Sequence, residues 1–376
     1  MYIQRTIEER ISKMLFSRKA ILLNGPRQCG KTTLLRHLAE GFAGDVLWMV
    51  GDDPSVRDML MDMTQQRWRN LLGNRRLVII DEAQKITGIG NSLKLVTDLF
   101  PEVQLIVSGS SSFELVSATS ESLTGRKHEC VLLPLSFREL AGSTSWMEER
   151  GQLENRLVFG SYPETVLSPD SASDVVSALT GSYLYKDVLA LEMIRKSATL
   201  EKLVKALALQ VGSEASVHEL AQITGSDDKT VERYLSILER AYVIFRLPAF
   251  SRNLRTELKK SRKVYFYDIG VRNAILGDFT RMPNRTDIGH LWENYLISER
   301  VKRQVFAGER VRRFFWRTVA QQELDYLEIT EDGKMRAFEF KWNPGKKAVL
   351  PAAFSHAYPE ASFEVITPVN YADEFL

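Results

Sequence analysis

Few cysteines, almost no net charge and no long apolar run characterise this sequence. Its two cysteines, Cys29 and Cys130, are too few for a disulfide framework and suit a reducing compartment, so we expect a cytoplasmic protein. Fifty Lys and Arg against 48 Asp and Glu leave a formal charge of +2, which excludes a global attraction to nucleic acid or membrane. No apolar run approaches the roughly 18 residues that cross a bilayer, so we expect no association with a membrane.

The length and composition predict a multidomain globular protein. At roughly 150 residues per domain, 376 residues predict two or three domains. The 44% hydrophobic and 26% charged residues exclude disordered and fibrous classes. Residues 1–15 carry charges throughout and are typical of an amphipathic helix rather than a signal peptide. Shifts in composition along the chain predict three domains, at residues 1–145, 146–250 and 251–376.

Short apolar runs alternate with helical patterns between residues 20 and 140. We expect strands at 20–24, 45–50, 76–80, 104–108 and, as a fifth candidate, 129–135. Near-continuous apolar strands separated by helices indicate a parallel sheet that is covered on both faces. Helical patterns dominate from about 145 to 245, and from 264 onward apolar strands are mixed with a helix. The predicted fold class is therefore α/β, with a parallel sheet, a helical segment and a C-terminal α/β domain in that order.

The segment GPRQCGKT, from Gly25 to Thr32, has the G-x-x-x-x-G-K-[ST] spacing of a P-loop. Its glycines allow backbone N–H groups to turn inward around phosphate oxygens at the N-terminus of the following helix. Lys31 is expected to reach the β- and γ-phosphates of ATP, and the Thr32 hydroxyl to bind Mg²⁺. We predict ATP contacts from Gly25, Pro26, Arg27, Gln28, Cys29, Gly30, Lys31, Thr32 and Thr33. A chance glycine turn is the alternative.

Two carboxylates end the apolar strand in RLVIIDEAQ, residues 76–84. Asp81 is predicted to hold Mg²⁺ through water, as the Walker-B Asp does in P-loop proteins. Glu82 is predicted to orient or deprotonate the attacking water. Adjacent carboxylates directly after a buried strand are otherwise uncommon, because an unpaired buried charge is costly. The alternative is a solvated strand end. Together with the P-loop, this strand predicts a P-loop NTPase that hydrolyses ATP.

Three further catalytic candidates follow. Ser108 and Ser110, where the strand 104–108 runs into SGSSS, are candidate sensors of the γ-phosphate, and a plain turn of serines explains them equally well. Arg126 is a candidate arginine finger toward a neighbouring subunit of a homo-oligomer, with a surface ion pair as the alternative. Cys29 is open to interpretation as an oxidation switch, but a small side chain without a regulatory role is the simpler explanation.

Residues 216–247 predict a helix, a turn at Gly225, a second helix capped by Ser226 and an extended segment. One helix face is apolar and comprises Val231, Tyr234, Leu235, Leu238 and Tyr242. This pattern resembles a winged helix-turn-helix, whose second helix enters a DNA major groove. The opposite face carries Lys229, Thr230, Arg233 and Arg240. Asp227 and Asp228 at the helix start would repel phosphates, so packing against protein is an equal alternative.

Two basic groups make DNA or RNA candidate partners. The first, in residues 252–263, comprises Arg252, Arg255, Lys259, Lys260, Arg262 and Lys263, with Glu257 as its one acid. The second comprises Arg300, Lys302, Arg303, Arg310, Arg312 and Arg313. A solvated linker explains the first group equally well.

The C-terminal strands ELDYLEI and RAFEFKW carry a second candidate site. A three-residue loop, Glu331 to Gly333, would pair residue 330 with 334 and place Asp325 opposite Glu339, on the face of Lys341. A two-residue turn would shift the register and separate them. Two facing carboxylates and a lysine suit a second Mg²⁺ or Mn²⁺ that hydrolyses phosphodiesters, with Glu293 as a further ligand. The alternative is an amphipathic strand with solvated ion pairs.

Taken in order, these pieces resemble a group of prokaryotic AAA-like ATP-binding proteins. Members join an N-terminal P-loop ATPase to a C-terminal domain of unknown function with a PD-(D/E)xK nuclease-like core. The resemblance depends on GPRQCGKTTLL, LVIIDEAQK, VSGSSSFEL, SLTGRK, PLSFREL, FGSYPETV, YFYDIGVRNA and ELDYLEI with AFEFKW. It implies ATP binding with Mg²⁺, hydrolysis, and a winged helix between the two α/β units. Glu293, Asp325, Glu339 and Lys341 match the nuclease pattern, with Leu324 in place of the usual Pro.

Three functions remain as hypotheses at this point. The first is an ATP-driven switch that controls a nucleic-acid-facing C-terminal module, with metal-dependent nuclease activity as an open part. The second is an ATPase whose C-terminal domain is catalytically inactive and mediates protein interaction or oligomerisation. The third, a kinase-like or transport protein, lacks substrate-binding signatures and membrane spans in this sequence.

Overall fold

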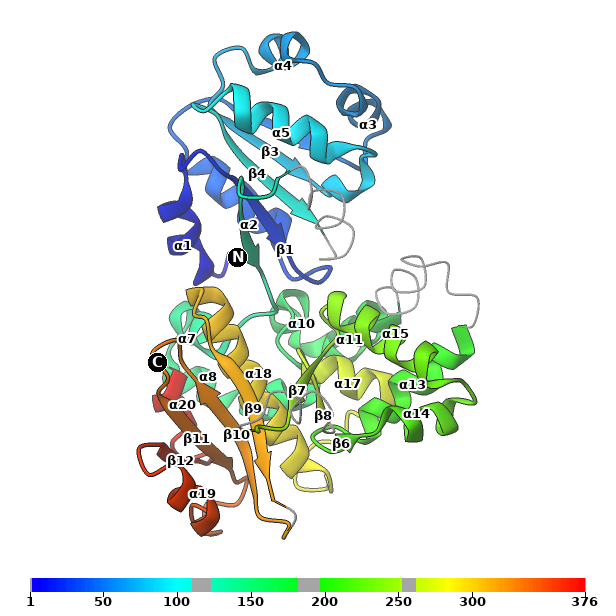
Figure 1. Cartoon of the computed structure of the whole chain (residues 1–376), viewed down its shortest axis with the longest axis vertical. Coiled ribbons are helices and arrows are strands. Elements are labelled where there is room, and N and C mark those ends of the chain that lie inside the picture. Colours follow the sequence, from blue (N-terminus) through cyan, green and yellow to red (C-terminus); the bar gives the residue numbers. More distant parts are fainter. Residues whose placement is uncertain (1, 110–122, 182–196, 252–261, 319, 376) are drawn as a thin grey trace. The chain divides into compact units, whose positions relative to one another are not determined.

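The computed structural model describes residues 2–109, 123–181, 197–251, 262–318 and 320–375 (Figure 1). Its contacts divide the chain into two compact units. The first unit comprises Met1–Pro134 and two short later segments, Arg240–Tyr242 and Val305–Gly308. The second unit comprises Leu135–Glu239, Val243–Gln304 and Glu309–Leu376. In the described part of the chain, no helix combines the length and apolar character that a membrane crossing requires.

A five-stranded parallel sheet forms the centre of the first unit. Its strands lie in the order β2-β3-β4-β1-β5. Their bounds are β1 Ala20–Asn24, β2 Val46–Val50, β3 Leu77–Asp81, β4 Gln104–Gly109 and β5 Lys127–Val131. Four predicted strands are confirmed to within a residue at each end. The fifth was predicted too far along the chain, because residues after Val131 leave the sheet but remain buried and apolar.

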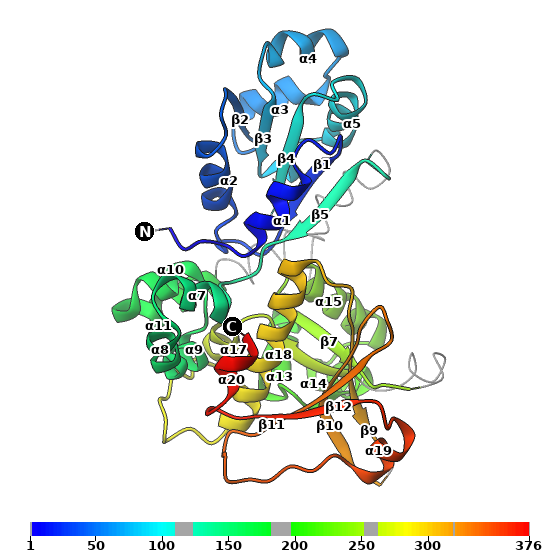
Figure 2. The ribbon, with the colours of Figure 1, turned by 90° about the vertical axis from the view of Figure 1, so that its left-hand side faces the viewer.

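Helices cover both faces of this sheet (Figure 2). They are α1 Ile7–Met14, α2 Lys31–Glu40, α3 Pro54–Met61, α4 Gln65–Leu72, the 3₁₀ turn η1 Ala83–Lys85 and α5 Ile89–Leu99. Side chains of β3 alternate between the faces, and Val78 and Ile80 join the core built by α3, α4 and α5. Helix α2 lies over the other face and buries Leu34 and Leu35. The predicted α/β class, with a parallel sheet buried on both sides, is confirmed.

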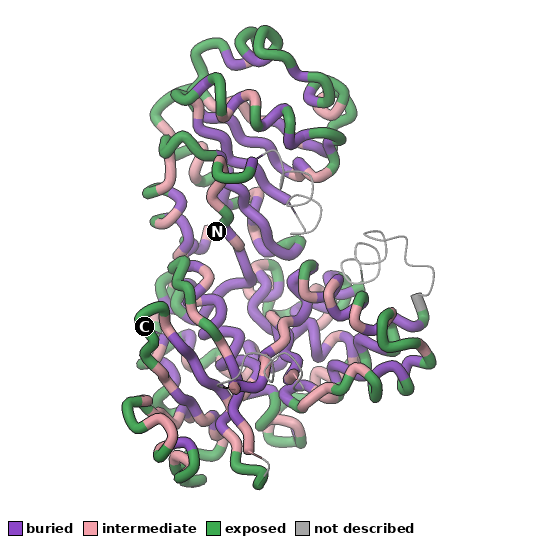
Figure 3. Tube along the Cα trace, in the orientation of Figure 1, coloured by how far each residue is buried: buried purple, intermediate pink, exposed green. Residues whose placement is uncertain are grey.

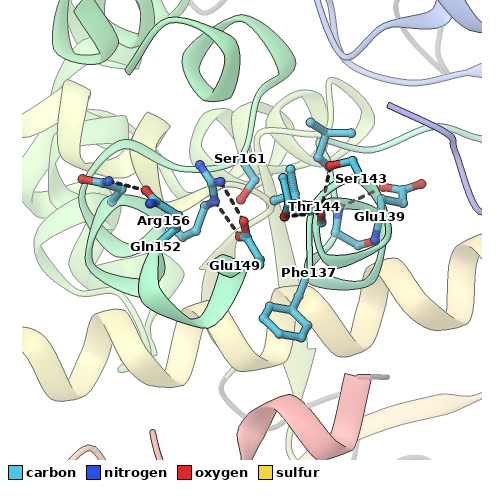
Figure 4. A network of polar contacts seen from close by, with 12 residues as sticks. Phe137, Glu139, Ser143, Thr144, Glu149, Gln152, Arg156 and Ser161 are labelled. Atoms are coloured by element: carbon cyan, nitrogen blue, oxygen red, sulfur yellow. Dashed lines mark hydrogen bonds and ion pairs between the residues drawn. The ribbon is translucent and has the colours of Figure 1, made fainter. Parts of the chain in front are cut away.

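Short helices open the second unit. They are α7 Phe137–Ser143, α8 Trp146–Gly151, α9 Leu153–Phe159, α10 Pro163–Leu167, the 3₁₀ turn η2 Pro169–Ser171, α11 Ala172–Thr180 and α13 Ser197–Leu209. Ser136 and Glu139 form a capping box at the start of α7. Arg156 of α9 forms a buried bidentate ion pair with Glu149 of α8, at 2.7 and 2.9 Å (Figure 4). The two parallel hydrogen bonds of this pair offset the free-energy cost of burying both charges.

A helix-turn-helix and a small sheet follow. Helices α14 Val217–Thr224 and α15 Asp228–Arg240 are joined by a turn in which Gly225 has a left-handed φ of 64°. Strands β6 Glu214–Ala215, β7 Ile244–Pro248 and β8 Arg262–Phe266 form an antiparallel sheet in the order β6-β8-β7. The apolar face predicted for the second helix is buried. The predicted cap was wrong by one residue, because the Asp227 carboxylate, not Ser226, accepts the Thr230 N–H at 2.9 Å.

The C-terminal part carries a four-stranded sheet in the order β12-β11-β10-β9. Its elements, with the preceding helices, are α17 Ile269–Leu276, α18 Ile288–Ala307, β9 Arg312–Arg317, β10 Glu323–Ile329, β11 Met335–Phe340, α19 Ala352–Ala357, β12 Ser362–Ile366 and α20 Tyr371–Phe375. Strands β10 and β11 pair Ile329 with Met335, and the Thr330 N–H donates to the Lys334 carbonyl. The register predicted from a three-residue loop is therefore confirmed. Strand β10 and most of α18 are buried, whereas β12 is largely only partly buried (Figure 3).

Two of the sequence segments that carry the resemblance meet in a buried contact. Asp268 caps α17 by accepting the Gly270 N–H at 2.9 Å, and its other oxygen accepts the Ser161 N–H at 2.7 Å. A Cβ on Gly160 would lie 1.9 Å from the Asp268 carboxylate, and one on Gly270 would lie 2.1 Å from the Phe159 carbonyl. Only glycine permits this approach. The segments FGSYP and YDIG are therefore explained by packing.

Candidate functional site

The P-loop connects β1 to α2 and has the backbone geometry that its sequence requires. Gly25 has φ 153° and Gly30 has φ 96°, which non-glycine residues rarely adopt. A Cβ on Gly25 would lie 2.0 Å from the Leu132 carbonyl oxygen, so only glycine fits. Lys31, Thr32 and Thr33 open helix α2, whose free N–H groups and dipole favour an anion. Within the loop, Pro26 and Cys29 are buried while Arg27 and Gln28 are exposed.

Lys31 is buried with a residual exposure of 5%. Its ammonium donates to the carbonyl oxygens of Gly25 and Pro26, at 3.0 and 2.7 Å. Both partners are neutral, and no carboxylate of the described residues forms an ion pair with this ammonium. A phosphate oxygen would therefore replace a dipole, not another anion, as the partner of this ammonium.

Asp81, at the end of β3, is buried and contacts two hydroxyl groups. Its Oδ2 accepts from the Thr32 hydroxyl at 2.6 Å, and its Oδ1 accepts from the Ser108 hydroxyl. Thr32 comes from α2 and Ser108 from β4, so three elements converge on this carboxylate. A hydroxyl and a carboxylate oxygen are the protein ligands that Mg²⁺ meets in P-loop proteins. The residues present therefore fit Mg²⁺.

Glu82 follows Asp81 and is partly buried. Its backbone is left-handed, with φ 52°, and its N–H donates to the Ser108 hydroxyl at 3.2 Å. Its carboxylate accepts from the Gln84 side-chain amide at 2.6 Å. Ser108 thus contacts the carboxylate of Asp81 and the backbone N–H of Glu82, a role that the sequence did not indicate. Ser110 lies outside the described residues.

The surroundings of Arg126 and Cys29 do not favour the arginine-finger and redox roles considered for them. The Arg126 guanidinium forms an ion pair with Asp98 of α5, which is the surface pair considered as an alternative to an arginine finger. The Cys29 thiol is fully buried and donates to the Leu132 carbonyl at 3.3 Å. Burial raises its pKa above the ordinary value, against smaller lowering effects of Lys31 and Arg5. A protonated, inaccessible thiol is a poor redox sensor.

The second candidate site brings together the C-terminal residues predicted for it. The register of β10 and β11 sets Asp325 opposite Glu339, and the Asp325 carboxylate accepts the Phe340 N–H at 2.8 Å. Lys341 forms an ion pair with Glu339. Burial, and next the charge of Glu293, raises the pKa of Asp325 to about 7. Burial and Asp325 likewise raise the pKa of Glu339.

Lys263 of β8 was not predicted to belong to this site, yet it contacts the acids directly. Its ammonium lies 3.3 Å from Glu293 and 2.5 Å from Glu323, and Glu293 also accepts from the Tyr265 hydroxyl at 2.5 Å. Burial lowers the pKa of Lys263, but Glu293 and Glu323 raise it more, so this side chain is charged. Among the described residues, no three His, Cys, Asp or Glu side chains are grouped to hold a metal ion.

The basic groups predicted to meet nucleic acid are only partly on the surface. Arg300 is fully buried and pairs with Glu328 at 2.7 Å, and Lys302 is buried against Glu299 at 2.7 Å. The prediction that these two residues belong to a basic surface patch was wrong, because α18 is buried on nearly every side and both of them lie in the core. Arg310 and Arg312 are exposed. In the first basic group, residues 252–261 lie outside the described part.

Family comparisons match the chain in three segments. Residues 17–141 match the family described as AAA domain. Residues 150–281 match the domain of unknown function DUF8612, and residues 288–371 match the domain of unknown function DUF4143. The AAA part of the resemblance is therefore supported, and two domains of unknown function follow it. The nuclease-like core is not part of these descriptions.

Relatives extend over nearly the whole chain. An uncharacterized protein of Mycobacterium tuberculosis is 29% identical over 346 residues, covering 90% of this chain and 74% of that protein. An uncharacterized protein of Methanocaldococcus jannaschii is 23% identical over 393 residues, covering 98% and 86%. The solved structure of a Walker-type ATPase of Pyrococcus abyssi is similar, with a TM-score of 0.53 and 15% identity over 73% of this chain and 96% of that chain. The AAA match and this likeness of fold support a P-loop ATPase.

Proposed function

We propose that the protein binds ATP with Mg²⁺ at the P-loop, hydrolyses it, and uses the nucleotide state as a switch that acts on the second unit. The observation that carries this proposal is the meeting of Thr32 and Asp81, 2.6 Å apart, beside a loop with left-handed Gly30 and the buried Lys31. The sites expected for phosphate, metal and water in a P-loop ATPase would thereby be adjacent.

Residues of the P-loop, β3 and β4 would have separate roles in ATP binding and hydrolysis. Backbone N–H groups at the start of α2 and the Lys31 ammonium would bind the β- and γ-phosphates. Thr32 and Asp81 would hold Mg²⁺, which would neutralise charge on the phosphates. Glu82 would orient the attacking water and accept its proton, while Ser108 keeps Asp81 and Glu82 in place. Ser110 and Arg126 remain predicted contributors, and a finger role for Arg126 would require a homo-oligomer and the loss of its pair with Asp98.

Calorimetric titration of ATP and a phosphate-release assay test this proposal directly. We expect saturable ATP binding, and hydrolysis that EDTA abolishes and Mg²⁺ restores. Asp81→Asn keeps the shape of the side chain and removes its charge, so it should bind ATP but lose Mg²⁺-dependent turnover. Asp170→Asn, at an exposed residue of η2, is the matched control. Absence of ATP binding by the wild-type protein would refute the proposal.

For the second unit we keep two candidate functions, and we propose that it comprises two domains with a boundary near residue 250. The facing Asp325 and Glu339, with Lys341 beside them, favour a nuclease-like module with its own Mg²⁺ or Mn²⁺. The insertion of the Lys263 ammonium among Glu293 and Glu323 favours a catalytically inactive domain that binds protein or a second copy of the chain. The helix-turn-helix of α14 and α15, with Lys229, Arg233 and Arg240 exposed, supports a winged-helix contact with DNA or RNA.

Two measurements separate these candidates. Nuclease activity predicts that DNA or RNA is cleaved with Mn²⁺ or Mg²⁺ and that Asp325→Ala abolishes cleavage. If wild type and Asp325→Ala cleave equally, or if neither cleaves, the result supports the candidate in which the C-terminal domain is catalytically inactive. Nucleic-acid binding predicts an affinity that falls steeply with salt, with each lost phosphate contact lowering the salt slope by about 1. An affinity that does not respond to salt would favour a protein partner.

A further inference from the structure

The guanidinium of Arg5 contacts the P-loop from an N-terminal segment that carries no nucleotide-binding motif. Arg5 is buried, with an exposure of 4%. One of its amino groups donates to the Cys29 carbonyl at 2.8 Å, and the other donates to the Leu133 carbonyl at 2.6 Å. A single planar side chain therefore joins the P-loop to the chain that follows β5.

The contact with Cys29 fixes one amide of the phosphate cradle. In a planar trans peptide the carbonyl and the following N–H point in opposite directions. Because the Cys29 carbonyl is held on Arg5, the Gly30 N–H is turned to the other side of the loop. Gly30 is the N-cap of α2, so its N–H belongs to the group of free amides that receives an anion. A positive charge on the carbonyl also strengthens this amide as a donor.

Arg5 is itself held by Glu8 of α1, and Tyr2 links this segment to α2. Its N–H donates to the Glu8 carboxylate at 2.6 Å, and the Tyr2 hydroxyl donates to the same oxygen at 2.5 Å. The Tyr2 ring stacks on His37 of α2 with 4.2 Å between centroids. The segment from Tyr2 to Glu8 is thus attached to the helix that the P-loop begins. Arg5 is placed by several contacts.

We call Leu132, Leu133 and Pro134 the connector; they end the first segment of the first unit, and Leu135 begins the second unit. Within the first unit, the Leu132 N–H donates to the Asn24 carbonyl, and the Leu132 carbonyl accepts from the Cys29 thiol. Within the second unit, the Leu135 N–H donates to the Ser161 carbonyl at 2.9 Å and its carbonyl accepts from Lys302. Leu133 and Leu135, on either side of Pro134, are therefore each hydrogen-bonded within their own unit.

We propose that Arg5 is a positioning residue that fixes the Gly30 amide for phosphate binding and transmits nucleotide occupancy to the connector. A phosphate that draws the Gly30 N–H inward changes the orientation of the Cys29 carbonyl. Arg5, which is bonded to both carbonyls, then shifts the Leu133 carbonyl. The inference rests on the proposed ATP binding, and it names one route by which the switch would reach the second unit.

The test uses the full chain with Arg5→Ala, Arg5→Lys and, as a matched control, Arg75→Ala at an exposed arginine. We measure ATP affinity by calorimetry, kcat and KM by phosphate release, and hydrogen exchange of peptides that contain residues 132–135 with and without a non-hydrolysable ATP analogue. Arg5→Ala should weaken ATP binding about tenfold, as expected for the loss of a charge-assisted hydrogen bond. It should raise KM more than it lowers kcat. Its nucleotide-dependent change in exchange at the connector should disappear.

Arg5→Lys keeps the charge but cannot hold two carbonyls in a planar fork. It should bind ATP with intermediate affinity and still lose the exchange response, and it keeps the test valid if Arg5→Ala fails to fold. Wild-type affinity and a wild-type exchange response in either folded variant would overturn the inference. If wild type itself binds no ATP, the proposed function fails. If wild type binds, Lys31→Ala does not, and the Arg5 variants match wild type, only this inference fails.

Discussion

The two carboxylate sites of this protein differ in what balances their charge. In the first unit, Asp81 contacts the neutral hydroxyls of Thr32 and Ser108, and Lys31 is held by carbonyl oxygens. In the second unit, partly buried acids are paired with Lys263 and Lys341. Neutral partners are easily replaced by a metal ion or a phosphate, whereas a buried ammonium must first be displaced at a large electrostatic cost. The same residue types thus make an open site in one unit and a self-neutralised site in the other.

The largest expected effect is at the open site. Lys31→Ala removes the buried cation that a polyphosphate would meet, so ATP affinity should fall by at least about 100-fold. Calorimetry measures the affinity, and Lys94→Ala, at an exposed lysine of α5, is the control. Tight ATP binding by Lys31→Ala would show that the loop does not hold the phosphates and would remove the contrast between the two sites.

Glu82→Gln tests whether the open site performs hydrolysis. The amide keeps the size of the side chain but cannot accept a proton, so kcat should fall by about 100-fold or more while ATP binding is kept. Single-turnover phosphate release measures the step, with Glu102→Gln at an exposed position as the control. Unchanged turnover would mean that another residue places the water.

Lys263→Met tests whether this lysine neutralises the acids of the site in the second unit. It leaves Glu293 and Glu323 without their buried partner, and the free energy of unfolding should fall by about 3 kcal/mol. Urea unfolding measures this loss, with Lys346→Met as an exposed control. Adding Glu293→Gln should cost less than the sum of the single changes, because the acid no longer needs its cation. Full additivity would show that Lys263 does not neutralise this site.

The smallest expected effect concerns Cys29. Because its pKa is raised, the thiol stays protonated at pH values at which an ordinary cysteine ionises. Burial also keeps reagents away from the sulfur atom. In a Cys130→Ser background at pH 8, a thiol reagent should label the native protein at less than about a tenth of the rate seen in urea. Cys29→Ala should change ATP affinity less than about threefold, since it removes one weak hydrogen bond. Rapid native labelling that abolishes ATP binding would instead make Cys29 a redox switch.

Much of the fold, and much of the first site, could be predicted because the signals are local. Apolar runs of four to six residues located four strands closely, and the loop between Gly25 and Thr32 is contiguous in the chain. The β10–β11 register followed from the loop that ends at Gly333, which sets every facing pair. The Ser226 cap was wrong because Ser and Asp are equally good caps, and the sequence does not decide which residue begins the helix.

Residues that reach a site from distant elements could not be predicted in this way. Lys263 lies 62 positions before Asp325 and belongs to a different sheet. Arg300 and Lys302 were assigned to a surface because basic residues are usually exposed, but α18 is buried on nearly every side. Ser108 was one serine of a cluster until the parallel order β3-β4 placed it beside Asp81.

By itself, the order of amino acids determined that a phosphate cradle exists, where its helix begins, and which strand brings acids to it. Those features depend on glycine conformations and on spacing within a few residues. Packing of remote segments decided which charges are balanced: hydroxyl groups beside one acid, ammonium groups beside others, and a guanidinium behind the loop. Electrostatic energy depends on distance through space, and neighbours in space are settled only when the chain has folded.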